Sequence, residues 1–235
     1  MKNAMAVLAA AVLCAGATTA PLGCARGGQD KGSKSALESD PTGWADVFPD
    51  RGFKGWKRVP IDPLASKVVW KHSPDGRTLL CDGTGGVKEL LLNDEERGDG
   101  IFHVEWRWGK DQGEKPNYNG GIYLRSSADG KVWIQAQVAR GEKPPRVGDF
   151  IGMLPVDGTP KRIDQIQKGE GREAPVGEWN TYEITCKGKT VSLWVNGGVT
   201  AVWENFPIAR GRLGLQAEFG AYEFRFLKYK PLGEK

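Results

Sequence analysis

Histidine and cysteine, the side chains most used to hold metals, are scarce in this chain. Its 235 residues include only two histidines, His72 and His103, and four cysteines, and no Cys/His spacing suits zinc. No Gly-x-Ser-x-Gly turn marks a nucleophilic serine, and no Asp-x-Asp-x-Asp run marks a calcium loop. We therefore expect no cofactor. A structural Ca²⁺ held by loop residues such as Asp94 or Asp99 is kept as an alternative.

Clustered positive charge is lacking too. The 33 lysines and arginines against 29 aspartates and glutamates leave a net charge of +4, and no basic run occurs. Nucleic-acid-binding chains interleave aromatic residues with Lys/Arg clusters, and this chain does not. The sequence therefore gives no reason to expect a nucleic-acid partner.

A membrane-spanning hydrophobic run is also missing. Met1-Lys2-Asn3 supplies one positive charge, and the apolar stretch at 4–17 is too short to cross a bilayer. This pattern predicts a signal peptide over residues 1–24 and export to the periplasm or the cell surface.

Two cleavage sites are open for this signal peptide. Ala17-Thr18-Thr19-Ala20 offers the small residues that a signal peptidase accepts. Leu22-Gly23-Cys24 resembles a bacterial lipoprotein box, in which Cys24 becomes the lipidated first residue, but Pro21 stands where the box usually has an aliphatic residue. A lipid anchor on Cys24 is thus the one membrane contact that the sequence suggests.

The rest of the chain divides into a tether and a domain. Residues 25–42 are rich in Gly, Ser, Lys, Asp and Gln, which predicts a flexible linker. Residues 43–235 fit a single all-β domain in size. This domain holds Cys81 and Cys186, which an exported protein could join. Because Cys186 alternates with Tyr182 on the apolar side of a strand, we favour buried free thiols.

Short alternating runs separated by Gly, Pro, Asn and Asp fill this domain, and no long amphipathic helix occurs. Lys187-Gly188-Lys189 and Asn196-Gly197-Gly198 carry turn chemistry between neighbouring runs. An antiparallel sandwich or barrel is therefore predicted, with the Pro- and Gly-rich stretch 141–177 as a loop around the rim of the sheet. The predicted strands are 68–72, 78–81, 100–108, 120–126, 132–139, 180–187, 190–195, 200–202, 212–218 and 222–229.

Four of these strands divide into an apolar face and a second face of unusual composition, because side chains alternate across a strand. The apolar face takes Val104, Trp106, Trp108, Ile122, Leu124, Ile134, Ala136, Val138, Leu213, Leu215, Ala217 and Phe219. The second face takes Glu105, Arg107, Tyr123, Arg125, Trp133, Gln135, Gln137, Gln216 and Glu218.

This second face suits a sugar. Amide and guanidinium groups match sugar hydroxyls, and aromatic rings stack on the C–H face of the sugar ring. We therefore predict a carbohydrate-binding surface. An ordinary solvated sheet face remains the alternative, with Glu105–Arg107 or Glu218–Arg125 as simple cross-strand ion pairs.

Several motifs, taken in order, resemble a known family. Asn119-Gly120-Gly121-Ile122-Tyr123-Leu124-Arg125 is similar to the Asn-Ser-Gly-Ile-Tyr-Leu-Arg motif of the DUF1080 family, the 3-keto-disaccharide hydrolase (3-keto-glucoside lyase/hydratase) domain. Glu178-Trp179-Asn180 resembles its strand start, Trp194-Val195-Asn196-Gly197 its hairpin, and Gly211 to Leu232 its closing hairpin. The resemblance covers essentially Gly43 to Leu232.

This resemblance implies a concanavalin A-like jelly-roll β-sandwich, exported from a bacterium, that cleaves glycosides whose sugar is oxidised at C3. The keto group acidifies the C2–H bond, so a base can remove that proton and the glycosidic oxygen can leave by elimination. Water then adds to the resulting glucal. Such a route needs a base, a group that stabilises the enolate and a proton donor for the leaving group.

Two positions depart from the family pattern. The family's Glu-x-Gln corresponds here to Gln135-Ala136-Gln137, and its Leu-Gln-x-His-Gly has Glu218 in place of the histidine. Either the acid/base group has moved, or this member binds sugar without cleaving it. One sequence leaves both open.

We assign the general acid/base role to Glu218, which an enzyme would hold within hydrogen-bonding reach of an arginine. Arg125 and Arg107 would stabilise oxyanion charge. The alternative function is a non-catalytic carbohydrate-binding sandwich at the cell surface. Under either function, the predicted sugar-binding residues are Asn119, Tyr123, Gln135, Gln137, Gln216, Glu105 and Trp133.

Overall fold

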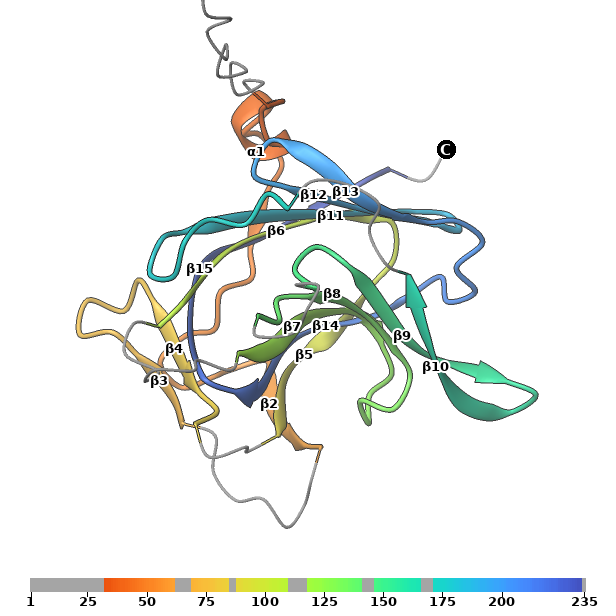
Figure 1. The fold of residues 1–235 in the computed structure, drawn as a ribbon, viewed down its shortest axis with the longest axis horizontal. Helices are drawn as coiled ribbons and strands as arrows, with labels where there is room; N and C mark the ends of the chain where they lie inside the picture. The colour runs from red at the N-terminus through yellow and green to blue at the C-terminus, as the bar shows by residue number, and fades with distance from the viewer. Residues whose placement is uncertain are drawn as a thin grey trace, which may run out of the picture. The chain divides into compact units, whose positions relative to one another are not determined.

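The computed structural model of the protein describes residues 32–61, 69–84, 88–109, 118–140, 146–165 and 171–233. The predicted signal peptide, Cys24 and the first part of the predicted linker lie outside these residues. Almost all regular structure in the described chain is β, and Figure 1 shows it as two layers of strands. The predicted all-β antiparallel sandwich is confirmed.

One layer is an eight-stranded antiparallel sheet in which the order is β13-β12-β11-β6-β15-β4-β3, with the short β1 paired to β15. Three of its strands, 100–108, 180–187 and 190–195, begin and end where the sequence predicts. Its strands are β1 (Ala45–Asp46), β3 (Val69–His72), β4 (Leu79–Asp82), β6 (Gly100–Trp108), β11 (Asn180–Lys187), β12 (Thr190–Val195), β13 (Gly198–Trp203) and β15 (Ala221–Pro231).

The other layer is a seven-stranded antiparallel sheet in the order β10-β9-β8-β7-β14-β5-β2. Consecutive strands β7 and β8 lie side by side, whereas β14 arrives from far along the chain to pair with β7 and β5. Its strands are β2 (Trp56–Pro60), β5 (Glu89–Arg97), β7 (Asn119–Ser126), β8 (Trp133–Gln137), β9 (Phe150–Val156), β10 (Thr159–Gln165) and β14 (Gly211–Phe219).

The core between the sheets is built from the predicted apolar face. Trp106 meets Trp108 edge-on at a centroid distance of 4.9 Å and Tyr182 at 5.3 Å, an arrangement worth about 0.5–1.5 kcal/mol per pair beyond area burial. All the predicted core residues are buried except Phe219. A register shift between Ala217 and Phe219 ends the alternation there, and Phe219 packs instead under the ammonium of Lys88.

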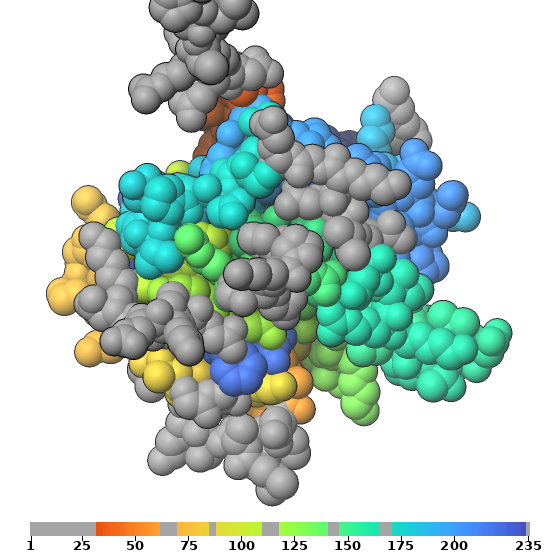
Figure 2. All heavy atoms as spheres, in the orientation of Figure 1, coloured from red at the N-terminus to blue at the C-terminus, as the bar shows by residue number. Residues whose placement is uncertain are grey.

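The prediction of a loop over 141–177 is wrong for its described centre. β9 and β10 form a hairpin in which Asp157 and Gly158, both at positive φ, make the turn. Figure 2 shows this segment projecting at the right edge of the view. Such an Asp-Gly pair is a strong hairpin signal, but Pro155 and Pro160 argued against strands. The two prolines face each other across the hairpin and are tolerated at this edge of the sheet. β2 and β5 were not predicted as strands either.

Cys81 and Cys186 are both buried and free, which confirms the predicted thiols. Burial raises the pKa of the Cys186 thiol to about 11, so it stays protonated at neutral pH. Within the described residues, the one helix, α1 (Ala36–Ser39), has four residues, and no helix is long and apolar enough to cross a membrane.

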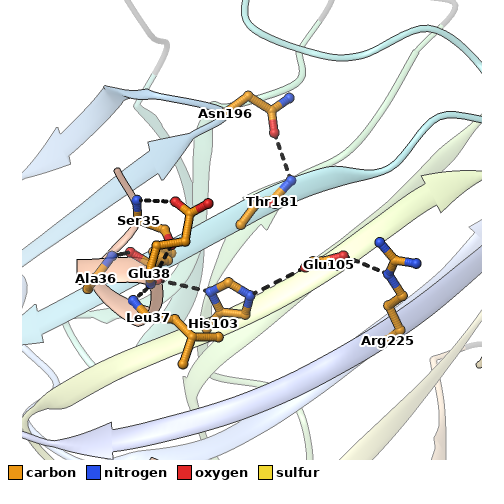
Figure 3. A network of polar contacts seen from close by, with 10 residues as sticks. Ser35, Ala36, Leu37, Glu38, His103, Glu105, Thr181, Asn196 and Arg225 are labelled. Atoms are coloured by element: carbon orange, nitrogen blue, oxygen red, sulfur yellow. Dashed lines mark hydrogen bonds and ion pairs between the residues drawn. The ribbon is translucent and has the colours of Figure 1, made fainter. Parts of the chain in front are cut away.

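A short turn before the domain is held on the outer face of the eight-stranded sheet, within the segment predicted as a flexible linker. Ser35 caps α1, and the backbone amides of Ala36 and Leu37 donate to the carboxylate of Glu183 on β11. His103 Nδ1 lies 2.9 Å from the same carboxylate. Figure 3 shows His103 between α1 and Glu105, which in turn pairs with Arg225.

The strength of this contact depends on pH, because it includes two buried groups that ionise, His103 and Glu183. Burial alone would lower the pKa of His103, but the carboxylates of Glu105 and Glu183 beside its ring outweigh burial and raise that pKa above the ordinary 6.5. Burial would raise the pKa of Glu183, but the bonds from His103, Ala36 and Leu37 lower it instead. The contact is therefore strongest between the lowered pKa of Glu183 and the raised pKa of His103.

We predict that this contact weakens at alkaline pH. The pKa of His103 is higher in the folded protein, so its stabilising contribution is complete below pH 6.5 and is lost as the pH rises through the folded value. The thermal midpoint should therefore fall more steeply above pH 6.5 in the wild type than in His103→Gln. The control is His72→Gln, since the polar contact of the His72 ring is with a backbone oxygen, that of Asp50. Identical pH profiles for the wild type and His103→Gln would contradict this account.

Candidate functional site

A cavity of about 470 Å³ lies on the outer face of the seven-stranded sheet, the face turned away from the core. Its volume falls in the range of roughly 300–1,000 Å³ typical of small-molecule sites. Most of its floor is amide side chains, so we call it the amide pocket. Its lining residues are Ile61, Asn119, Tyr123, Gly130, Lys131, Trp133, Gln135, Gln137, Ile151, Met153, Pro160, Arg162, Gln216 and Glu218.

Gly121 at the centre of the sheet creates the space for these amides. It stands on β7 directly between Gln137 of β8 and Gln216 of β14. A Cβ at Gly121 would lie 2.1 Å from Nε2 of Gln135 and 2.4 Å from its Cγ. The missing side chain therefore lets Gln135 lie across β7 and reach the amide of Gln216.

A chain of hydrogen bonds runs across the three strands. Asn119 Oδ1 accepts from Gln137 Nε2 at 3.1 Å, and Gln216 Oε1 accepts from Gln135 Nε2 at 2.8 Å. Nε2 of Gln135 also contacts Gln137 Oε1 and lies 3.1 Å from Gly120 O. Three oxygens thus compete for two hydrogens. The network has spare acceptors, which suits it to receive hydroxyl donors.

An aromatic pair adjoins this network. Tyr123 and Trp133 stack with their centroids 4.6 Å apart and their planes 29° from parallel. Tyr123 is buried, and burial, followed by the charge of Glu218, raises the pKa of its phenol, which therefore stays neutral. Trp133 is half-buried beside the cavity. An aromatic ring at such a wall is a platform for the C–H face of a sugar.

Glu218 stands at the end of the hydrogen-bond network and is the one carboxylate among the described residues that line the amide pocket. Its Oε2 accepts from Gln216 Nε2 at 3.1 Å, and its Oε1 lies 2.9 Å from the ammonium of Lys88. The side chain of Glu218 is 16% exposed. The predicted partner was an arginine, and the structure supplies a lysine from the segment before β5. The alternative Glu218–Arg125 pair does not form.

Glu105 and Arg107 lie on the other sheet, so the prediction of one shared face is corrected. β6 belongs to the eight-stranded sheet, and both side chains point to that sheet's outer surface. Glu105 pairs with Arg225, and Arg107 pairs with Glu223, each at 2.6 Å. They do not pair with each other. Alternation assigns a side to each residue but does not tell which strands share a sheet.

Arg125 is also outside the amide pocket, although it belongs to β7. Between Tyr123 and Ser126 the strand carries one residue more than its partner β14, and Arg125 has a φ of +47°. This bulge turns its side chain into the end of the sandwich, where it donates to Gly188 O and Ile208 O and pairs with Asp99. We therefore withdraw Arg107 and Arg125 as oxyanion-stabilising residues.

Cationic residues of the site come from segments that the sequence did not point to. Arg162 lines the pocket from β10 and pairs with Asp164 at 2.9 Å, and Lys131 lines it from the turn before β8. The Asp-Gly hairpin signal could have revealed β10 and with it Arg162, because it predicts that β10 pairs with β9, and β9 in turn pairs with β8. Nothing local in the sequence indicates that Lys88 meets Glu218.

The described residues hold no group of three or more His, Cys, Asp or Glu side chains that could bind a metal ion. Asp99 receives Gly188 N at 2.7 Å and Arg125, and Asp94 lies 3.7 Å from Arg212. Both carboxylates considered for Ca²⁺ are therefore matched with positive or N–H groups.

A cavity of about 560 Å³ at one end of the sandwich is larger than the amide pocket. Arg97 in its lining pairs with Glu95 at 2.6 Å and covers the ring of Tyr229, and Asp99 pairs with Arg125. The amide pocket, by contrast, leaves acceptors and a ring edge for a ligand. We therefore place the site in the amide pocket.

The sequence profile of the 3-keto-alpha-glucoside-1,2-lyase-like domain matches residues 43–230. The chain belongs to this family. This confirms the resemblance found in the motifs, and it covers both sheets and all the residues of the amide pocket. No curated protein sequence matches the chain significantly.

Solved structures that share this fold differ widely from the chain in sequence. A Parabacteroides distasonis protein provisionally described as a glycosyl hydrolase is 16% identical, with a TM-score of 0.57 over 86% of this chain and 100% of its own. The carbohydrate-binding module CBM66 from Bacillus subtilis is 14% identical, with a TM-score of 0.53 over 75% and 95%.

A third structure, a Bacillus subtilis protein of unknown function with a galectin-like fold, is 10% identical, with a TM-score of 0.51 over 82% and 100%. At such identities the likeness shows the fold alone. The predicted jelly-roll sandwich is confirmed.

Replacing Gly121 should disable the amide pocket. In Gly121→Ala the new methyl group would displace Gln135, cutting its bond to Gln216, and overpacking should cost about 1–3 kcal/mol of stability. Sugar binding measured by calorimetric titration should then be lost while the chain still folds by circular dichroism. Gly233→Ala, where an added methyl meets no atom within 4 Å, is the control. Unchanged binding in Gly121→Ala would show that the amide network is not the site.

Proposed function

We propose that the protein cleaves glycosides whose sugar is oxidised at C3, with Glu218 as the base that removes the proton from C2. The observation that carries the proposal is the placement of Glu218. It stands where the amide network ends, beside the Tyr123–Trp133 pair and 2.9 Å from Lys88. Membership of the 3-keto-alpha-glucoside-1,2-lyase-like family supports this choice of chemistry.

The chemistry assigns a task to each group. Loss of the C2 proton to the carboxylate leaves an enolate on the C3 oxygen, and the ammonium of Lys88 is the nearby cation that would stabilise this charge. The electrons then expel the glycosidic oxygen from C1, and Glu218 returns its proton to that oxygen. Water adds to the glucal in a later step. The amides of Gln135, Gln137 and Gln216 hold the remaining hydroxyls.

Carbohydrate binding without cleavage is the second candidate. It is favoured by the composition of the amide pocket, in which Gln135 replaces the family's glutamate and Glu218 is already paired with Lys88. The fold is shared with a carbohydrate-binding module. In this case the Tyr123–Trp133 pair and the amides supply the affinity for the sugar, and no side chain takes a proton from it or gives one to it.

The protein acts outside the cytoplasm in either case. This part of the proposal is supported by the leader sequence at residues 1–24, in which Cys24 is one candidate for the first residue after cleavage and for lipid attachment. The substrate is therefore a sugar available in the periplasm or at the cell surface.

Release of the aglycone separates the two functions. The purified chain is incubated with a p-nitrophenyl 3-keto-glucoside and, in parallel, with the unoxidised p-nitrophenyl glucoside. We expect release from the keto substrate alone, and a drop of about 10²–10⁴-fold in Glu218→Gln, the usual contribution of a general base. Glu204→Gln, on an exposed turn after β13, should keep the wild-type rate.

Binding measured on the same samples decides the remaining outcomes. Loss of release with binding retained in Glu218→Gln supports the role of base. Binding of the keto sugar by the wild type without any release would exclude the lyase and establish the binding module. If Glu218→Gln still releases the aglycone, a residue other than Glu218 is the base.

A further inference from the structure

Phe226 is turned out of the sandwich by a bulge in β15. In the register of β15 with β6, Arg225 stands opposite Glu105 and Lys228 stands opposite His103. Phe226 and Leu227 together therefore oppose the single Val104. Leu227 takes the inward position and is fully buried, whereas Phe226 is 52% exposed. Regular alternation after the buried Phe224 would have placed Phe226 inward.

This conformation is unfavourable for both backbone and side chain. Phe226 has a φ of +50°, a left-handed geometry that bulky L-residues avoid because Cβ crowds the carbonyl oxygen. Exposing a phenyl ring forfeits its burial as well. Bulges that re-aim a side chain concentrate next to binding sites, and strained backbone does the same.

A cavity of about 500 Å³ opens beside this ring, and we call it the Phe226 pocket. It lies on the opposite layer from the amide pocket, between β15, β1 and the turn joining β3 to β4. Its side chains combine two phenyl rings with carboxylate, guanidinium and hydroxyl groups: Phe226, Phe48, Asp46, Asp75, Arg77 and Thr78. Rings with planar hydrogen-bonding groups are the same combination that fits a sugar in the amide pocket.

Neighbouring contacts hold the ring and its surroundings in place. The guanidinium of Arg225 lies 5.2 Å from the ring of Phe226 and 4.0 Å from the ring of Trp179. Arg225 is fixed in turn by its ion pair with Glu105. Phe48 is held edge-on against His72 at 5.7 Å. A binding platform of this kind loses little conformational freedom when a ligand arrives.

We propose that the Phe226 pocket is a second saccharide-binding site, in which Phe226 stacks on the C–H face of a sugar unit. The charged and hydroxyl groups around it bond the hydroxyls. It is separate from the amide pocket and does not depend on whether that pocket catalyses. A site on each layer would let the protein hold a glycan chain while the amide pocket engages a terminal unit.

Amide NMR of the ¹⁵N-labelled chain, titrated separately with maltotriose, cellotriose and isomaltotriose, tests the proposal. At least one probe should shift the signals of Arg77, Thr78 and Phe226 as a group. In Phe226→Ala these shifts should require about tenfold or more sugar, while shifts at Gln135 and Gln216 persist. Trp133→Ala should have the reverse effect, so failure of one site is distinguished from failure of the other.

Two controls protect this test. Val202→Ala removes another exposed apolar side chain, on β13, and should leave both groups of shifts intact. Phe226→Gly should raise the thermal midpoint, because glycine accepts the positive φ, and should still lose the second group of shifts. The proposal is overturned if no probe shifts Arg77, Thr78 and Phe226, or if these shifts need no more sugar in Phe226→Ala than in the wild type. Concentration-dependent self-association abolished by Phe226→Ala would overturn it too, because it would assign the ring to a protein contact.

Discussion

Trp106 lies edge-on against both Trp108 and Tyr182 between the two sheets, and this contact fixes which side of β6 and β11 faces inward. The opposing sheet must then supply matching apolar side chains, which it does through Ile122 and Leu215. Since side chains alternate, packing one face dictates the composition and position of the other. The amide pocket exists because the outward positions of β7, β8 and β14 align once the core is packed.

Departures from regular pleating decide which side chains become functional. The bulge in β7 removes Arg125 from the outer face and uses it to hold the end of the sandwich. The bulge in β15 does the reverse and brings Phe226 to the surface. Gly121 has no side chain, and this leaves the space in which Gln135 lies across β7. Two bulges and one missing side chain therefore decide which side chains reach the outer faces at these three positions.

Sequence reasoning succeeded where it depended on alternation and failed where it needed neighbours. It found β6, β11 and β12 to the residue, and it placed Gln135, Gln216 and Glu218 on a common face. It added Arg107 to that face because period-two patterns carry no information on which strands share a sheet. It missed the β9–β10 hairpin because prolines masked an Asp-Gly turn. The Lys88–Glu218 pair joins segments 130 residues apart, which local patterns do not reveal.

The central claim is that the amide pocket holds the sugar and presents its C2 to Glu218. A crystal structure of Glu218→Gln with a bound 3-keto-glucoside tests this most directly, because the variant should retain the substrate uncleaved. We predict the sugar ring against Trp133, its hydroxyls on Gln135 and Gln216, and C2 within reach of the side chain at position 218. A sugar bound elsewhere, or with C2 turned away from position 218 and Lys88, would contradict the account.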